Sequence, residues 1–194
     1  MKPFFLVLSI ICLLGACSSN KYKNPHIEIQ TNAGDIEVEL YLDQAPKSVA
    51  AFLSYIDSGF YKDCSFYRVL NMDNQPSDAP KAELIQGGLW GGKRKRPELP
   101  GIPHETTQQT HILHTNGVIS LARLEPGTAN TEFFICIGDQ PGFDYGGANN
   151  ADGQGYAAFG KVVKGMDVVM KIYARNEEDQ RFDPPVPIFK IVRL

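Results

Sequence analysis

Apolar and polar residues alternate along the first part of the domain. Between residues 35 and 42 every second side chain is apolar, and the side chains between them are mostly charged. This period of two is typical of a β-strand that buries one face. Ile27 and Ile29 repeat the alternation, and a turn-forming sequence at residues 32–35 separates the two segments. The pattern therefore predicts a β-hairpin.

Two other segments have the period of an α-helix. The first begins with Pro46, which suits a first helical turn, and it is followed by Gly59, which suits the position after a helix end. In each segment four apolar side chains fall at positions i, i+3, i+4 and i+7 and form one stripe. The stripes are Val49, Phe52, Leu53 and Ile56 in the first segment and Met166, Val169, Met170 and Tyr173 in the second.

Short apolar runs complete the pattern. They cover residues 66–70, 83–86, 117–122, 132–137, 157–163 and 188–192. Together with the hairpin they predict eight strands, joined by loops that are rich in glycine and proline. Eight strands and two helices predict a mainly β fold, a closed eight-stranded antiparallel β-barrel capped by two α-helices.

The sequence "TEFFIC" at residues 131–136 places two aromatic rings side by side. Phe133 and Phe134 point to opposite faces if the segment is a strand. One ring must fill the barrel, and the other must face outward, where a helix covers it or it lines a pocket.

The first sixteen residues form a separate segment. The apolar run from Phe4 to Leu14 is too short to span a membrane, which takes about 20 helical residues, but it suits a signal peptide. The run ends at Leu14-Gly15-Ala16-Cys17, which resembles a bacterial lipobox. We therefore expect residues 1–16 to be a lipoprotein signal peptide and Cys17 to carry the lipid (palmitate). An ordinary signal peptide with an incidental cysteine is the alternative.

The remaining chain is expected to contain a tether and one domain. Residues 17–26 hold the lipidated cysteine and a polar tether, and residues 27–194 form the domain. Ser18 directly after the cysteine resembles the sorting pattern for the outer membrane of diderm bacteria, so we expect the periplasmic face of that membrane. Cys64 and Cys136 lie in separate predicted strands. We read them as packed thiols, although an exported compartment permits a disulfide.

Composition and charge exclude some partners. The hydrophobic fraction of 43% fits a globular domain, and the net charge of -3 provides no basic field for nucleic acid. We expect a monomer that binds no nucleic acid.

Several candidate sites do not have the spacing that their chemistry needs. His104, His111 and His114 lie near Glu105, but they lack the spacing of known zinc motifs, so loop histidines are favoured over a metal site. The glycine pairs do not match a phosphate-binding loop, and no nucleophile motif is present. The sequence therefore predicts neither a metal nor a cofactor.

One set of segments remains, and it suits peptide binding. The segments "FYRV", "QGG", "SLAR", "TEFFIC" and "YAAFGKVVKGMDVV" contribute one arginine, one amide and several apolar groups, but no base. Such a set suits an apolar group beside a peptide and does not suit hydrolysis.

Together with "GDIEVELYLDQAPKSVAAFL", these segments resemble, in order, the cyclophilin family of peptidyl-prolyl cis-trans isomerases over residues 27–192. The resemblance implies that Arg68 is the catalytic arginine and that Gln86 hydrogen-bonds both Arg68 and the substrate. It implies that Phe133 belongs to the core. The implied substrate-binding positions are Leu84, Phe134 and Phe143 around the proline, Ala122 on the peptide groove, Glu132 in place of a usual glutamine, and Tyr156 in place of a usual histidine or tyrosine.

An arginine can catalyse this isomerisation without a cofactor. Rotation about an X–Pro bond breaks amide resonance, which sets a barrier of ~18–20 kcal/mol. At the twisted transition state the proline nitrogen regains its lone pair, and a guanidinium can donate a hydrogen bond to it. This bond is stronger in the transition state than in the ground state, as catalysis requires.

The chain departs from the family pattern beside the pocket. Residues 71–82 form an insertion, Glu83 replaces a usual pocket phenylalanine, and Gly142 stands near a usual aromatic residue. Because strand residues alternate, Glu83 should not enter the pocket, and we expect it to face solvent or pair with a cation. The insertion should lie beside the groove and supply the missing wall, with Met72 as its best apolar candidate.

The resulting expectation is a peptidyl-prolyl isomerase that assists the folding of exported or envelope proteins by acting on proline-containing polypeptides. The alternative is a weakly catalytic or non-catalytic proline-peptide binding module at the membrane, which Glu83 and the insertion favour. A plain structural lipoprotein is the third reading.

Overall fold

The computed structural model describes residues 22–90 and 97–194. The expected signal peptide and the expected lipidation site Cys17 lie outside the described residues.

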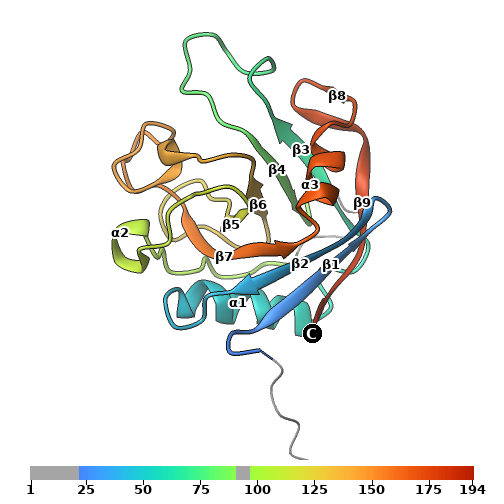
Figure 1. Cartoon of the computed structure of the whole chain (residues 1–194). Coiled ribbons are helices and arrows are strands. Elements are labelled where there is room, and N and C mark those ends of the chain that lie inside the picture. Colours follow the sequence, from blue (N-terminus) through green and yellow to red (C-terminus); the bar gives the residue numbers. More distant parts are fainter. Residues whose placement is uncertain (1–21, 91–96) are drawn as a thin grey trace, which may run out of the picture.

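The strands of the described chain form one antiparallel sheet that closes on itself (Figure 1). The hydrogen-bonded order is β1-β2-β7-β5-β6-β4-β3-β9-β8, and β1 also pairs with β9. This last pairing closes the predicted eight-stranded barrel, which is confirmed, and β8 is a short addition. The strands are β1 (His26–Thr31), β2 (Gly34–Leu40), β3 (Cys64–Leu70), β4 (Leu84–Gly88), β5 (Val118–Leu121), β6 (Phe133–Cys136), β7 (Ala157–Lys164), β8 (Glu177–Glu178) and β9 (Arg181–Arg193).

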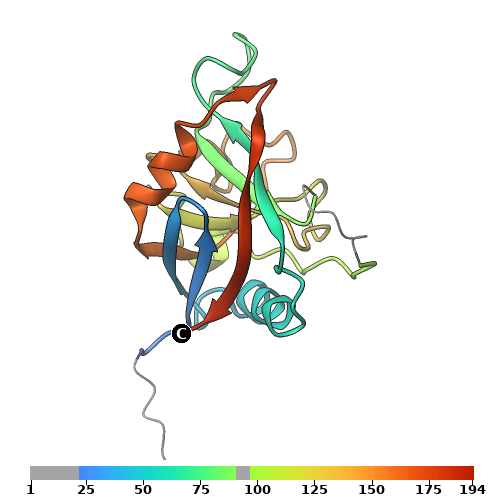
Figure 2. The same cartoon turned by 90° about the vertical axis from the view of Figure 1, so that its right-hand side faces the viewer.

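Both predicted helices are present. Helix α1 (Pro46–Asp57) and helix α3 (Met166–Tyr173) cover different ends of the barrel, as the two views in Figures 1 and 2 show. Two single turns were not predicted, the helix α2 (Thr107–Thr110) and the 3-10 helix η1 (Pro141–Phe143). Helix α2 is too short for a periodic signal, but its capping box, formed by Thr106 and Gln109, is visible in the sequence.

Strand β9 is longer than predicted. It extends from residue 181 to residue 193, whereas the apolar run covers only residues 188–192. The additional part contains Pro184, Pro185 and Pro187, which lack a backbone N–H and weaken the strand signal. Its first part pairs with β3 and its last part pairs with β1.

A distant carboxylate satisfies the first turn of α1. The residue before the helix, Ala45, has no side-chain acceptor. Instead, Glu105 Oε1 accepts from the Lys47 N–H at 3.1 Å, and Glu105 Oε2 accepts from the Ser48 N–H at 2.8 Å and its hydroxyl at 2.7 Å. The first N–H groups of a helix have no partner within the helix, and together with the helix dipole they favour a negative charge at this end.

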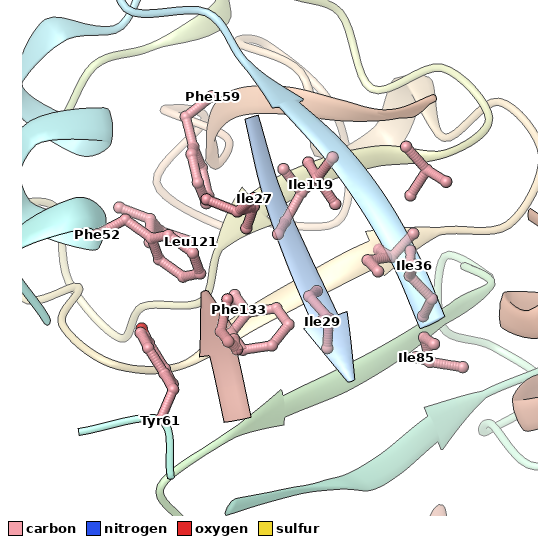
Figure 3. Close-up of a cluster of buried hydrophobic side chains, with 14 of the residues drawn as sticks. Ile27, Ile29, Ile36, Phe52, Tyr61, Ile85, Ile119, Leu121, Phe133 and Phe159 are labelled. Atoms are coloured by element: carbon pink, nitrogen blue, oxygen red, sulfur yellow. The ribbon is translucent and has the colours of Figure 1, made fainter. Parts of the chain in front are cut away.

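Aromatic rings fill one end of the barrel (Figure 3). Phe133 is fully buried, and its ring meets Phe52 of α1 edge-on at 5.6 Å between centroids. Tyr61 and Phe66 lie at 5.8 Å from the same ring, also nearly edge-on. Edge-to-face contacts of this kind add to the stability gained from burial of apolar area. Phe133 is therefore the inward ring of the adjacent pair.

Two further observations concern the helices and the cysteines. Within residues 22–90 and 97–194 no helix is long and apolar enough to cross a membrane. Cys64 and Cys136 are both buried and free. Burial raises the pKa of the Cys64 thiol to about 12, which makes it a packing group rather than a nucleophile.

Truncation of Phe133 should destabilise the domain strongly. We expect Phe133→Ala to lower the free energy of unfolding by about 3–5 kcal/mol, because it leaves a cavity among the three rings that pack against Phe133. Phe189→Ala is the control, since Phe189 is 51% exposed on β9, and it should change stability by about 0.5 kcal/mol or less. Urea unfolding followed by circular dichroism measures both, and similar losses in the two variants would contradict this assignment of the core.

Candidate active site

A second apolar cluster lies on the outer face of the barrel. It contains Phe134, which is 2% exposed and belongs to β6. The Phe134 ring packs against Phe143 at 5.2 Å and against Tyr156 at 5.4 Å between centroids. The rest of the cluster consists of Leu70, Ala82, Leu84 and Cys136, with Ala122 packed against it. The two adjacent phenylalanines therefore serve different clusters on opposite faces of one strand.

A β-bulge in β3 turns Arg68 toward this outer face. Cys64 and Phe66 point into the barrel, so strict alternation would also point residue 68 inward. The pairing of β3 with both β4 and β9 shifts between Phe66 and Arg68. The extra residue, Tyr67, restores Val69 to the core and leaves both Tyr67 and Arg68 outside.

Two neutral amides hold the Arg68 guanidinium. Its Nη1 donates to Gln86 Oε1 at 3.2 Å. Its Nε and Nη2 both donate to Gln180 Oε1, at 3.2 and 2.7 Å. Gln180 lies in the turn between β8 and β9, with a backbone φ of +68°. The amides fix the orientation of the guanidinium without neutralising its charge.

The hydrogen-bond chain continues from Gln86 to a buried acid. Gln86 Nε2 donates to the Tyr67 hydroxyl at 2.8 Å, and that hydroxyl donates to Glu132 Oε2 at 2.7 Å. Glu132 also accepts from the Thr131 hydroxyl at 3.1 Å. The backbone N–H groups of residues 89 and 90 donate to its other oxygen at 3.0 and 3.1 Å.

Burial and hydrogen bonding oppose each other at Glu132. Burial raises the pKa of this carboxyl above its usual value of 4.5, while the donors from Tyr67, Thr131 and the backbone lower it. The effect of burial is the larger, so the net pKa is raised. The same burial, with the charge of Glu132, raises the pKa of the Tyr67 hydroxyl, which therefore stays protonated as a donor.

These side chains surround a cavity of about 390 Å³. Arg68, Gln86, Ala122 and Glu132 line it, and Trp90 and Leu124 add apolar surface. The expected residues Leu84, Phe134 and Phe143 do not line this cavity, because they fill the adjacent apolar cluster. Ala122 belongs to both, so the cavity and the cluster are continuous.

Tyr156 joins the apolar cluster to a charged neighbour. Its ring packs edge-on against Phe143 at 5.2 Å, and the Arg123 guanidinium lies 5.4 Å from its centroid. Arg123 forms a two-point ion pair with Asp152, at 2.7 and 2.9 Å. Arg123 lowers the pKa of Asp152 to about 2, and Asp152 in turn neutralises the charge of Arg123.

Ser120, His114 and Asp144 form a Ser-His-Asp alignment in which His114 packs against Phe134. This alignment was not expected from the sequence. His114 Nδ1 lies 2.8 Å from Asp144 Oδ1, and Nε2 lies 3.0 Å from Ser120 Oγ. Because a carboxylate oxygen only accepts, Nδ1 is the donor in the contact with Asp144. Ser120 is 0% exposed, so no substrate carbonyl can reach it. The imidazole instead stacks on Phe134 at 6.0 Å and holds that ring in place.

The structure corrects one expectation about Glu83 and one about the insertion. Glu83 stays out of the pocket as expected, but it accepts a hydrogen bond from Tyr173 Oη at 2.5 Å instead of facing solvent or pairing with a cation. The reason is that α3 packs beside this face of β4. Met72 is 53% exposed and is not a wall of the cavity. Ala82, at the end of the insertion, joins the apolar cluster instead.

The insertion nevertheless reaches the arginine through one contact. Gln180 Nε2 donates to the Asn74 carbonyl at 3.0 Å, while Gln180 Oε1 holds Arg68. Figure 1 shows the β3–β4 loop and the β8–β9 hairpin beside each other at the top of the molecule. Sequence reasoning missed Gln180, because the β8–β9 turn carries no motif and lies far from Arg68 in the chain.

The histidines and Glu105 do not converge. His104 Nε2 lies near the Gln154 carbonyl, at 3.2 Å, Glu105 caps α1, and His111 is exposed. Among the described residues no group of three His, Cys, Asp or Glu side chains is placed to hold a metal ion. The chemistry that the site offers is a fixed cationic hydrogen-bond donor beside an apolar surface.

Comparison with known proteins gives consistent matches. A family model described as "Cyclophilin type peptidyl-prolyl cis-trans isomerase/CLD" matches residues 26–193. A peptidyl-prolyl cis-trans isomerase of Acinetobacter baylyi is 35% identical over 156 residues, which are 80% of this chain and 75% of that protein. Peptidyl-prolyl cis-trans isomerase B of Escherichia coli is 36% identical over 149 residues, which are 75% of this chain and 82% of that protein.

A solved structure has the same fold. It is a cyclophilin type peptidyl-prolyl cis-trans isomerase of Cryptosporidium parvum, crystallised in the presence of the dipeptide Ala-Pro. It is 25% identical, covers 86% of this chain and 97% of its own, and superposes with a TM-score of 0.68.

The raised pKa of Glu132 predicts a pH-dependent stability difference. A carboxyl whose folded pKa is raised contributes stability below its unfolded pKa, and this contribution is lost as the pH rises through the folded pKa. Relative to Glu132→Gln, the wild type should therefore lose stability as the pH rises from below 4.5 through that higher value. Urea unfolding across this range checks the difference. Glu125→Gln, on an exposed loop, is the control. If the wild type instead gained stability relative to Glu132→Gln as the pH rises, the four donors would outweigh burial in setting the pKa of Glu132.

Proposed function

The chain belongs to the cyclophilin-type peptidyl-prolyl cis-trans isomerases, and from this membership we propose that it catalyses X–Pro rotation in exported proteins with Arg68 as the catalytic residue. The isomerase activity follows from the family. The roles of individual residues and the exported substrates are our proposal.

One observation carries the role of Arg68. Its guanidinium lines the cavity, and its three hydrogen bonds to described residues all go to oxygens of neutral amides. A carboxylate partner would neutralise the positive charge of Arg68, whereas neutral amides leave that charge available to a ligand. The residue stays protonated because an arginine keeps its charge at any working pH, even though burial lowers its pKa.

We place the proline ring against the apolar cluster and its nitrogen toward Arg68. Leu84, Phe134 and Phe143 provide the apolar surface, which opens where Ala122 meets the cavity. The related Cryptosporidium parvum structure was obtained with the dipeptide Ala-Pro, which supports a proline-containing peptide as the ligand here. Contact with the cluster requires its rings to move slightly, because Phe134 and Phe143 are 2% and 4% exposed.

The reaction then needs no proton transfer and no covalent step. As the X–Pro bond twists, the proline nitrogen becomes pyramidal and gains a lone pair, and Arg68 donates a hydrogen bond to it. Gln86 keeps the guanidinium in place through Nη1, and Gln180 does so through Nε and Nη2. The fixed dipoles are in place before the reaction, so little reorganisation is needed at the transition state.

We propose the periplasmic face of the outer membrane of a diderm bacterium as the place of action. The support is the sequence Leu14-Gly15-Ala16-Cys17 followed by Ser18. A lipid on Cys17 would hold the domain near the membrane through a polar tether of residues 17–26. The barrel closes within one chain, which supports action as a monomer.

Replacement of Arg68 should abolish most of the activity but preserve the fold. Loss of one preorganised donor to a developing charge costs about 100-fold or more in rate. We expect Arg68→Ala to lower kcat/KM by about this factor, and Arg68→Lys to recover only part of it because a lysine cannot keep both amide contacts. Exchange NMR on a proline peptide measures the rates.

The far-ultraviolet circular dichroism spectrum should be the same in each variant. Arg175→Ala is the matched control, since Arg175 is exposed beyond α3, and it should keep the full rate. Near-normal catalysis by Arg68→Ala would refute the role given to Arg68.

Replacement of Cys17 should release the protein from the membrane. We expect Cys17→Ala to appear as soluble or unprocessed protein, because Cys17 is the residue that carries the lipid in this proposal. Membrane fractionation and gel mobility, with Cys136→Ala as the control for loss of a cysteine, test it. Membrane attachment and mobility unchanged from the wild type would argue against lipidation.

A further inference from the structure

A second arginine lies directly beside Arg68. Arg181 at the start of β9 pairs with Arg68 across the β3–β9 ladder. Opposite residues in an antiparallel pair point to the same face, with about 4.5–5.5 Å between their Cβ atoms. Both side chains line the same cavity, and Arg181 is exposed whereas Arg68 is partly buried. The wall of the cavity therefore carries two adjacent positive charges.

No described acidic side chain forms an ion pair with either arginine. Glu178 of β8 lies opposite Arg181 in the hairpin but makes no ion pair with it. Glu177 Oε2 accepts instead from the Gln180 N–H at 2.8 Å. Glu132, which also lines the cavity, uses its oxygens on four donors. The charge of the arginine pair is left for a ligand.

Like charges directly opposite each other destabilise a sheet. Arg181 adds to the effect of burial in lowering the pKa of Arg68, so the two charges repel each other in the free protein. A ligand carboxylate would relieve this repulsion, and the planar guanidinium fork matches a carboxylate at two points.

The position of the cavity indicates which side of the proline it accepts. The proline nitrogen faces Arg68 in the proposed function, and the preceding residue is attached to that nitrogen. The cavity and the apolar cluster meet at Ala122, and Leu84, Phe134 and Phe143 do not line the cavity. A proline ring on the cluster therefore leaves the cavity to the residues attached to the proline nitrogen, which precede the proline. Two extended residues cover about 7 Å, which keeps their side chains within reach of Arg181.

We propose that Arg181 makes this isomerase prefer peptides with an acidic side chain one or two residues before the proline. The proposal rests on the proposed function, because it assumes that the proline nitrogen faces Arg68. Arg181 determines specificity and takes no part in the bond rotation.

Peptide pairs that differ only in charge test this preference. Each pair has Glu or Gln one or two residues before the proline, with acetylated and amidated ends so that no terminal charge interferes. We expect the wild type to favour the better placed Glu peptide by about five-fold in kcat/KM at low salt, mainly through KM, because the contact forms in the ground state as well. High salt should reduce the preference.

Arg181→Gln should remove the preference, so that its kcat/KM values for the Glu and Gln peptides of each pair become equal. Arg175→Gln, which removes an exposed arginine away from the cavity, should keep the preference. A Lys peptide should be disfavoured by the wild type and tolerated better by Arg181→Gln.

The outcomes separate the two proposals. If the enzyme does not accelerate exchange in the neutral peptides, the proposed function fails. If neutral peptides are accelerated but acidic peptides gain nothing at either position, or if Arg181→Gln keeps the full preference, the function stands and the role of Arg181 is refuted.

Discussion

The β-bulge at Tyr67 is the constraint on which the site depends. An unbroken strand would turn Arg68 into a barrel filled with aliphatic and aromatic side chains, where an unpaired guanidinium is very costly. One extra residue reverses the alternation, so β3 gives Phe66 and Val69 to the core and Arg68 to the outer face. The same irregularity places Tyr67 beside Arg68 on one surface, which begins the hydrogen-bond chain to Glu132.

The chemistry around that surface divides between neutral and charged partners. Arg68 is held by amide oxygens on two sides, whereas Arg123 is neutralised by Asp152 and Glu132 is surrounded by donors. Rigid orientation and available charge are usually in conflict, because the strongest partner of an arginine is a carboxylate. The two glutamines resolve that conflict. Gln180 also connects the arginine to the carbonyl of Asn74 in the loop of residues 71–82.

Periodicity and motifs predicted the barrel, both long helices and the opposite fates of Phe133 and Phe134, because these depend on local alternation that a sequence displays directly. The residues around Arg68 were only partly predictable. Gln86 came from a motif, but Gln180 and Arg181 reach the site through the β3–β9 pairing, and no local pattern reveals which residues a long strand brings opposite each other. The partner of Glu83 was missed for the same reason, since Tyr173 approaches it from α3. The alignment of Ser120, His114 and Asp144 depends on loop geometry that follows no spacing rule.

The closing pair of the barrel has a consequence for how the domain forms. β1 and β9 are the first and last strands of the domain. Because β9 pairs with β1 on one side and with β3 on the other, both of these strands have an edge of unpaired backbone groups until β9 takes its place. Contacts between distant parts of a chain raise the contact order and slow folding. The folding chain therefore presents an open sheet with two unpaired edges until β9 is in place, and during this interval the domain is most prone to aggregation.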